Sequence, residues 1–170
     1  MSKSTQEIFE YLNTAFPEAG LQYESAALGD PWVSIPPSEW KIIAKFLRDD
    51  QELRFDTMMC LSGIHYPDEN QLAIACHLNA SEKGYKLAIK VKVPIGNPLI
   101  DSVESIWKTA DWHEREAYDM FGIIFQGHPD FRRILCPDDW EGFPLRKDYV
   151  PQDSYMGITT KFSTEDESND

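Results

Sequence analysis

Two runs of alternating residues constrain this chain more than any other feature. In residues 72–78 and again in residues 87–93, large apolar side chains occupy every second position. Alternation with a period of two is typical of strands that bury one face. The turn-forming residues 81–84, which end in Gly84, join the two runs. The sequence therefore predicts an antiparallel hairpin with a buried face and a wet, lysine-bearing face.

Helices and shorter strands precede this hairpin. Ser4 and Glu7 form a capping-box pattern that opens a helix ending before Pro17. Ser38 is the expected N-cap of a second helix. Short extended segments at 21–28 and 32–35, and a longer apolar strand from Phe55 to Ile64 with a turn at 67–70, complete this part.

The second half predicts two more helices and then irregular chain. A short helix opens at Asp101 or Ser102 and runs through Trp107, and Asp111 with Glu114 caps a helix that ends at Gly122. We expect an α+β fold: N-terminal helices packed on a mixed, largely antiparallel sheet, followed by an irregular C-terminal extension. Residues 1–125 form the globular domain, and residues 126–170 form a partner-binding extension with an acidic, mobile tail.

Charge and hydropathy exclude several classes of function. Sixteen Lys and Arg against 29 Asp and Glu give a net charge of −13, which argues against binding to nucleic acid or to anionic lipid. No uncharged apolar run approaches the ~20 residues that span a bilayer. The N-terminal sequence lacks the apolar core of a signal peptide. We expect a cytosolic chain that meets a membrane only through partners.

Metal and cofactor signatures are weak. Cys60, Cys76 and Cys136 are an odd number without a CxxC spacing, and the four histidines are scattered. The run that begins His113-Glu114 resembles the start of the HExxH zinc motif, but Ala117 stands where the second histidine is needed. We therefore expect no metal and no cofactor bound by this chain.

The helix that ends at Gly122 carries an apolar stripe and four acids. The stripe predicts an inward face made of Ala110, His113, Ala117, Met120, Phe121 and Ile124. His113 is either a ligand or proton relay or, as we favour, a histidine at the core edge. The row Asp111, Arg115, Asp119 indicates a solvated or salt-bridging face, with proton chemistry as the less favoured interpretation.

Residues 127–149 combine arginines and large apolar side chains on a backbone interrupted by Pro and Gly. This mixture is typical of protein–protein hot spots. The alternative is a long loop that folds back on the core of its own chain.

Three stretches resemble a known family: ADWHEREAYDMFGIIF (110–125), GHPDFRRIL (127–135) and GFPLRKDY (142–149). They are similar to the signature of the 30-kDa subunit, also called the C subunit, of respiratory complex I, NADH:quinone oxidoreductase. The pattern E-R-E-x-Y-D-x-F-G-I at 114–123 is its most specific part. Phe131 and Cys136 depart from it, since an aliphatic and a polar residue are usual there.

The resemblance implies a cofactor-free, non-catalytic structural subunit in the quinone-reducing module of a proton-translocating NADH:quinone oxidoreductase (NDH-1). FMN, iron–sulfur clusters and quinone would be held by other subunits. The expected partners are the large hydrogenase-like D subunit, which forms the quinone pocket, and the iron–sulfur B and I subunits. The expected location is peripheral, on the cytoplasmic side of the cell membrane.

The resemblance also implies a partner interface. Arg132, Arg133 and Arg146 should make bidentate contacts to carboxylates or carbonyls. The interface residues, carried over position by position, are Glu114, Arg115, Glu116, Tyr118, Asp119, Phe121, Gly122, His128, Pro129, Arg132, Arg133, Pro144, Leu145, Arg146, Lys147 and Asp148.

Two alternatives stay open at this point. Similar subunits occur in membrane-bound hydrogenases and in ferredoxin- or coenzyme-F420-linked complexes, so the electron donor is not determined by this chain. A free-standing enzyme that uses Glu114, Glu116 and His113 would show activity alone and lose it on Glu114→Gln.

Overall fold

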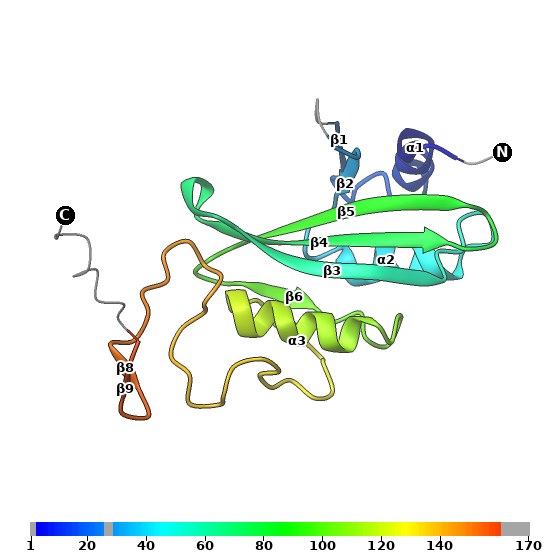
Figure 1. Cartoon of the computed structure of the whole chain (residues 1–170). Helices are drawn as coiled ribbons and strands as arrows, with labels where there is room; N and C mark the ends of the chain where they lie inside the picture. The colour runs from blue at the N-terminus through cyan, green and yellow to red at the C-terminus, as the bar shows by residue number, and fades with distance from the viewer. Residues whose placement is uncertain (1–2, 26–28, 161–170) are drawn as a thin grey trace, which may run out of the picture.

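The computed structural model describes residues 3–25 and 29–160. Its centre is a five-stranded sheet in the order β1-β2-β5-β4-β3 (Figure 1). The parallel pair is β2 with β5, and the other neighbours are antiparallel, which confirms a mixed, largely antiparallel sheet. The strand bounds are β1 Gln22–Glu24, β2 Trp32–Ser34, β3 Thr57–Tyr66, β4 Gln71–Ala80 and β5 Tyr85–Pro94.

The predicted hairpin is β4 and β5. Their register pairs Leu78 with Leu87 and Cys76 with Ile89, so the apolar positions of both strands share one face. Side chains at every second position of β5 are buried, and the lysines between them point to the other face. Between β3 and β4, the 3-10 helix η1 (Pro67–Glu69) forms the predicted turn.

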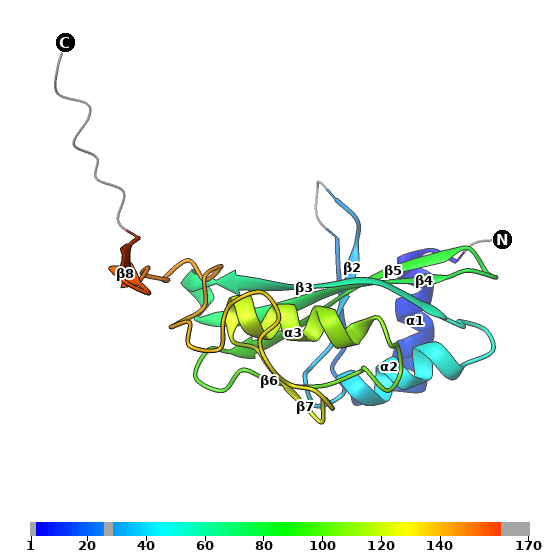
Figure 2. The ribbon, with the colours of Figure 1, turned by 60° about the horizontal axis from the view of Figure 1, so that its bottom comes forward.

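Helices cover the buried face. Helix α1 (Thr5–Ala15) begins with the predicted capping box, in which the Ser4 and Glu7 side chains each bond the other residue's backbone N–H. Helix α2 (Trp40–Asp49) lies with α3 (Ala110–Phe121) on one side of the long strands (Figure 2). The predicted N-cap Ser38 is wrong, because the helix starts after Glu39 and no side chain caps it.

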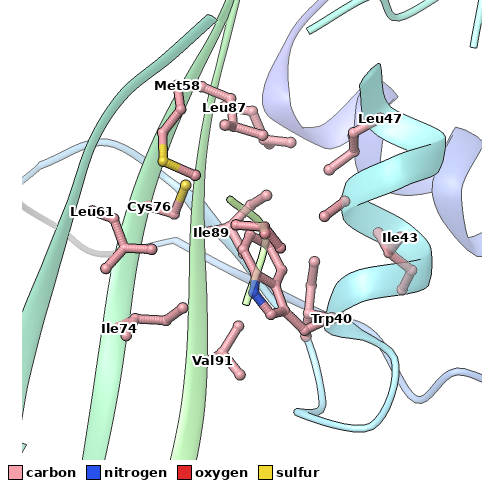
Figure 3. Close-up of a cluster of buried hydrophobic side chains, with 14 of the residues drawn as sticks. Trp40, Ile43, Leu47, Met58, Leu61, Ile74, Cys76, Leu87, Ile89 and Val91 are labelled. Carbon is pink, nitrogen blue, oxygen red and sulfur yellow. The ribbon is translucent and has the colours of Figure 1, made fainter. Parts of the chain in front are cut away.

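The core lies between α2 and the sheet. Trp40, Ile43 and Leu47 of α2 point toward Ile89 and Val91 of β5 (Figure 3), and all five are almost fully buried. Each such side chain contributes about 1.5–3 kcal/mol by leaving water. The same face of the sheet continues under α3.

A second, parallel pair of strands was not predicted. Strand β6 (Leu99–Asp101) pairs with β7 (Ile124–Gln126), and α3 (Ala110–Phe121) connects them. The expected short helix from Asp101 or Ser102 through Trp107 is wrong: Asp101 ends β6, and turns follow it. The Ser102 N–H donates to the Gln126 carbonyl, which draws this backbone into an extended pairing.

The C-terminal part is irregular, as expected, with two exceptions. Strand β7 crosses the predicted boundary between residues 125 and 126, and β8 (Ser154–Tyr155) pairs with β9 (Ile158–Thr159) in a small hairpin that projects away from the sheet (Figure 1). The two-part division of the chain stays a prediction. Of the tail predicted to be mobile, residues 161–170 lie outside the described residues.

The close packing of α3 on β3 depends on Gly63. A Cβ atom there would lie 2.3 Å from the Phe121 ring. We predict that Gly63→Ala lowers the free energy of unfolding by about 1–3 kcal/mol, because the ring must move. Gly96→Ala is the matched control, since a Cβ there meets nothing within 4 Å. Chemical denaturation measures both, and equal stability of the two variants would contradict this packing.

Candidate partner interface on helix α3

Helix α3 buries most of its predicted apolar stripe. Ala110, Ala117 and Met120 are buried, as expected. His113 and Phe121 are half-buried. Ile124, predicted to face inward, is 38% exposed, because it lies in β7 and not on the helix.

The charged side chains of α3 are mostly buried as well. Glu114 and Asp119 have no exposed surface and Arg115 is 6% exposed, whereas Glu116 is exposed. Of the two interpretations of this row, the solvated face is wrong for Arg115 and Asp119, and the salt-bridging face is confirmed, since Arg115 lies 3.6 Å from Asp130 and Asp119 lies 2.6 Å from Arg133. Residues 128–147 fold back over Arg115 and Asp119 and supply their polar partners, whereas the turn after β6 supplies those of Glu114.

Asp119 has the densest set of contacts. One carboxylate oxygen accepts hydrogen bonds from the N–H groups of Ile134, Leu135 and Cys136 at 3.1, 2.7 and 2.8 Å. The other oxygen lies 2.6 Å from a guanidinium nitrogen of Arg133. Burial raises the pKa of Asp119, but these N–H groups and the guanidinium outweigh it and hold the pKa below its usual value.

Arginines tie the segment together through carbonyl groups. Arg133 donates to the carbonyl oxygens of Trp140 and Gly142 at 3.1 and 3.0 Å. Arg115 donates to the carbonyl oxygens of Arg132 and Arg133, both at 3.3 Å. Both guanidinium groups thus donate hydrogen bonds to backbone carbonyls that lie outside any helix or sheet and need a donor from elsewhere.

Glu114 contacts the turn after β6. Its carboxylate accepts from the Ser102 hydroxyl at 2.6 Å and from the Val103 N–H at 2.8 Å. The predicted capping box with Asp111 is wrong, because α3 begins after Thr109 and Glu114 points into the protein. Burial raises the pKa of Glu114 to about 7, against the hydrogen bonds, which lower it.

His128 joins the segment to the start of α3. Its Nδ1 accepts from the Asp130 N–H at 3.1 Å, which assigns the ring proton of a neutral imidazole to Nε2. Nε2 then donates to the Asp111 carbonyl at 3.1 Å and lies 4.0 Å from the Glu114 carboxylate.

The end of α3 receives the last part of the segment. Gly122 has φ +78, and a Cβ there would lie 2.6 Å from Phe143 and 2.8 Å from Arg146. Arg146 stacks on the Phe143 ring at 4.7 Å and donates from Nε to the Phe121 carbonyl at 2.6 Å. Glycine at position 122 therefore permits both the left-handed backbone and this close approach.

One contact reaches the sheet itself. The Lys147 N–H donates to Nδ1 of the buried His65, at the end of β3, at 2.9 Å. The Asp148 carboxylate lies 3.7 Å from the same nitrogen.

The sixteen predicted interface residues thus divide into two groups. One group, which includes Tyr118 against Phe131 at 4.5 Å and the half-buried Pro144, makes contacts inside the chain. The expected arginine contacts to carboxylates and carbonyls exist, with Arg132 bonding both oxygens of Asp130, but within this chain. The exposed group is Glu116, Pro129, Arg132, Leu145, Lys147 and Asp148.

Sequence reasoning missed several residues of this region. His65, Ser102 and Val103 lie outside the family motifs and contact this region only through long-range folding. Asp130 and Phe143 lie within the motifs at 127–135 and 142–149, but were not among the predicted site residues. The one available signal for the Ser102 and Val103 contacts was Glu114 itself. An acid beside the apolar stripe of a helix needs hydrogen-bond donors from elsewhere in the chain if the fold buries it.

Three buried polar atoms in the described residues 140–152 have no hydrogen-bond partner: Trp140 Nε1, the Tyr149 hydroxyl and Gln152 Nε2. All three are donors, and two of these residues, Tyr149 and Gln152, line a cleft of about 470 Å³. In the described part of the chain, no group of three or more His, Cys, Asp and Glu side chains is arranged as metal ligands. Within residues 3–25 and 29–160, no helix is long and apolar enough to cross a membrane.

The structure is a small α+β domain whose C-terminal segment is held across one helix and leaves apolar side chains exposed. These features are typical of a subunit of a larger assembly. The chain belongs to the family described as the 30 kDa subunit of respiratory-chain NADH dehydrogenase, whose sequence profile matches residues 33–155. This confirms the resemblance found in the sequence.

The sequences of related proteins support the assignment to this family. The NADH-quinone oxidoreductase C subunit of Chlorobium phaeobacteroides is 44% identical over 161 residues, which are 94% of this chain and 97% of that protein. The same subunit of Chloroherpeton thalassium is 55% identical over 124 residues, which are 72% of this chain and 51% of that protein.

Solved structures share the fold. The trypsin-resistant fragment (1–134) of Nqo5 is 28% identical with a TM-score of 0.57, covering 70% of this chain and 98% of the fragment. A chain of the membrane-bound sulfane sulfur reductase, an archaeal respiratory membrane complex, is 24% identical with a TM-score of 0.68, covering 85% of both chains. At that identity the second likeness concerns the fold alone.

The contacts of Asp119 generate a first prediction for this region. Asp119→Asn should lower the free energy of unfolding by about 3 kcal/mol, because Arg133 loses its buried partner. Trypsin should then cut faster after Arg132 and Arg133. The exposed Asp138→Asn is the matched control, and unchanged digestion of the Asp119 variant would contradict the proposed fastening.

The lowered pKa of Asp119 also fixes the direction of its pH effect. The stabilisation is fully present above the ordinary pKa of aspartate and is lost as the pH falls through the lower folded-state pKa. The stability difference between the parent protein and Asp119→Asn should therefore shrink in strong acid.

The raised pKa of Glu114 predicts the opposite dependence of the free energy of unfolding on pH. With a folded-state pKa of about 7 against an ordinary value of 4.5, the folded protein holds a proton that the unfolded chain has lost. Stability should fall, by on the order of 2 kcal/mol, as the pH rises from 4.5 to 7. Glu114→Gln should remove this slope and the exposed Glu116→Gln should keep it, as denaturation at several pH values will measure. An identical slope in both variants would overturn the assignment.

Proposed function

We propose that this chain is a non-catalytic, cofactor-free structural subunit of the quinone-reducing module of a proton-translocating NADH:quinone oxidoreductase. It binds the large quinone-site D subunit through the surface formed by α3 and residues 127–149, beside the iron–sulfur B and I subunits. Electrons then pass from NADH through the clusters of other subunits to quinone. The assembly holds the chain peripherally, on the cytoplasmic side of the cell membrane.

The observation that carries this proposal is the exposed apolar surface of the folded-back segment. Leu135 is 63% exposed and Leu145 is 53% exposed, although the backbone on either side is fastened to α3. Further along, Val150, Met156 and Ile158 are also exposed. Apolar side chains that a fold holds in water are typical of surfaces that a partner covers.

The unpartnered donors support the same interpretation. Trp140, Tyr149 and Gln152 each keep a buried hydrogen-bond donor without an acceptor in the described chain. An unsatisfied buried donor costs about 1–3 kcal/mol. A partner that brings carbonyl or carboxylate oxygens to this surface would remove that cost.

The names of the relatives support NADH as the electron donor. Both proteins named above, at 44% and 55% identity, are C subunits of an NADH-quinone oxidoreductase by name. This favours NADH over hydrogen, ferredoxin or coenzyme F420 as the donor of the whole complex. The likeness to a chain of the sulfane sulfur reductase concerns the fold and does not bear on the donor.

The exposed leucines provide the sharpest test of docking. We predict that Leu135→Gln with Leu145→Gln reduces co-purification of the large D subunit from mildly solubilised membranes by about tenfold or more, as expected for a hot spot. Ile42→Gln, on α2 and 58% exposed, is the matched control. Thermal unfolding of the free chain should be unchanged in all variants. Arg146→Ala is less suitable, since Arg146 also holds Phe121.

The proteins that co-purify with the parent chain distinguish an NADH:quinone oxidoreductase from a membrane-bound hydrogenase. Recovery of nicotinamide-binding and iron–sulfur subunits with NADH:quinone reductase activity is the expected result. A nickel-containing subunit in their place would replace the proposal with the hydrogenase alternative. Full retention of the partner by the double leucine variant would contradict the proposed docking surface.

A further inference from the structure

The outer face of the sheet, opposite α3, carries a cysteine–histidine pair. Cys60 on β3 and His77 on β4 are cross-strand neighbours, and Sγ of Cys60 lies 3.4 Å from Nδ1 of His77. The pair is outside the candidate partner interface and takes no part in the contacts that hold it. Its chemistry is therefore independent of the proposed function.

A β-bulge creates this pairing. Met58 pairs with Leu78 and Cys60 pairs with His77, so Met59 is an extra residue in β3. In a regular strand, Met58 and Cys60 would point to the same side. Because of the bulge, Met58 faces the core, whereas Cys60 is half-exposed beside the exposed His77. Bulges commonly redirect a side chain near a functional site.

The pair opens into a cavity of about 400 Å³. Its lining combines charged and apolar groups from the start of α1, the residues before β2 and strands β3 to β5: Thr5, Asp30, Pro31, Met59, Leu78, Lys86, Leu87 and Ala88. Cavities that hold small ligands have about 300–1,000 Å³. Lys86 and Asp30 offer opposite charges to a ligand that carries both carboxylate and ammonium groups.

The other two thiols of the chain are in different environments. Cys76 points into the core beside Met58 (Figure 3), and burial raises its pKa. Burial and the nearby Asp119 carboxylate raise the pKa of Cys136. Thiolates are the reacting species, so both environments disfavour reaction.

We propose that Cys60 is a thiol-modification site that forms a mixed disulfide with a low-molecular-weight disulfide of the glutathione class. His77 Nδ1 accepts the thiol proton, and the Cys60 sulfur attacks one sulfur of the bound disulfide. A new S–S bond forms, the S–S bond of the reagent breaks, and the departing thiolate takes up a proton. The disulfide reagent is the oxidant, and no other redox partner is needed.

The test uses the full folded chain and oxidised glutathione, with peptide mapping by mass spectrometry over time. Cys60 should acquire one glutathione first, well ahead of Cys76 and Cys136. His77→Gln should slow this reaction by at least about tenfold, because the amide side chain cannot accept the thiol proton that Nδ1 of His77 accepts. Cys60→Ser should abolish the early adduct, and Cys136→Ser should leave its rate unchanged.

Two further arms keep the proposal falsifiable. In denaturant, the three cysteines should react at similar rates, which shows that the selectivity comes from the fold. Circular dichroism confirms that each variant is folded. First reaction at Cys136, or an unchanged Cys60 rate in folded His77→Gln, would overturn the proposal.

Discussion

The buried carboxylate of Asp119 is the interaction on which the C-terminal half depends. A carboxylate without contact to water must be surrounded by donors, and here three consecutive backbone N–H groups and one guanidinium supply them. The requirement is mutual, because residues 134–136 form no regular structure and their N–H groups also need acceptors. One side chain therefore fixes the path of residues 134–136, which form no regular structure of their own.

Helix α3 consequently acts as the organising element of this half of the molecule. Its inner face packs on β3 at Gly63, and Glu114 fastens the turn after β6. Its outer side holds the segment through Asp119 and Arg115. The result is a surface of exposed leucines on fixed backbone, which is pre-organised and so reduces the entropy cost of binding a partner.

Local signals in the sequence predicted the elements that local chemistry determines. The capping box of α1 and the hairpin of β4 and β5 depend on neighbouring residues, and both are confirmed. Strands β6 and β7 have three residues each and pair across a helix, so no periodicity revealed them. The family motif drew attention to the charged residues of α3, but their spacing could not show that Glu114 and Asp119 are buried, since their partners lie elsewhere in the chain.

Hydrogen–deuterium exchange of the free chain tests the central claim most directly, because it reports the N–H groups of residues 134–136 themselves. If Asp119 fastens the segment before any partner binds, these amides exchange slowly in the free chain and at a similar rate in the assembled complex. Exchange at the rate of an unfolded peptide in the free chain, with protection only after assembly, would contradict a preformed surface.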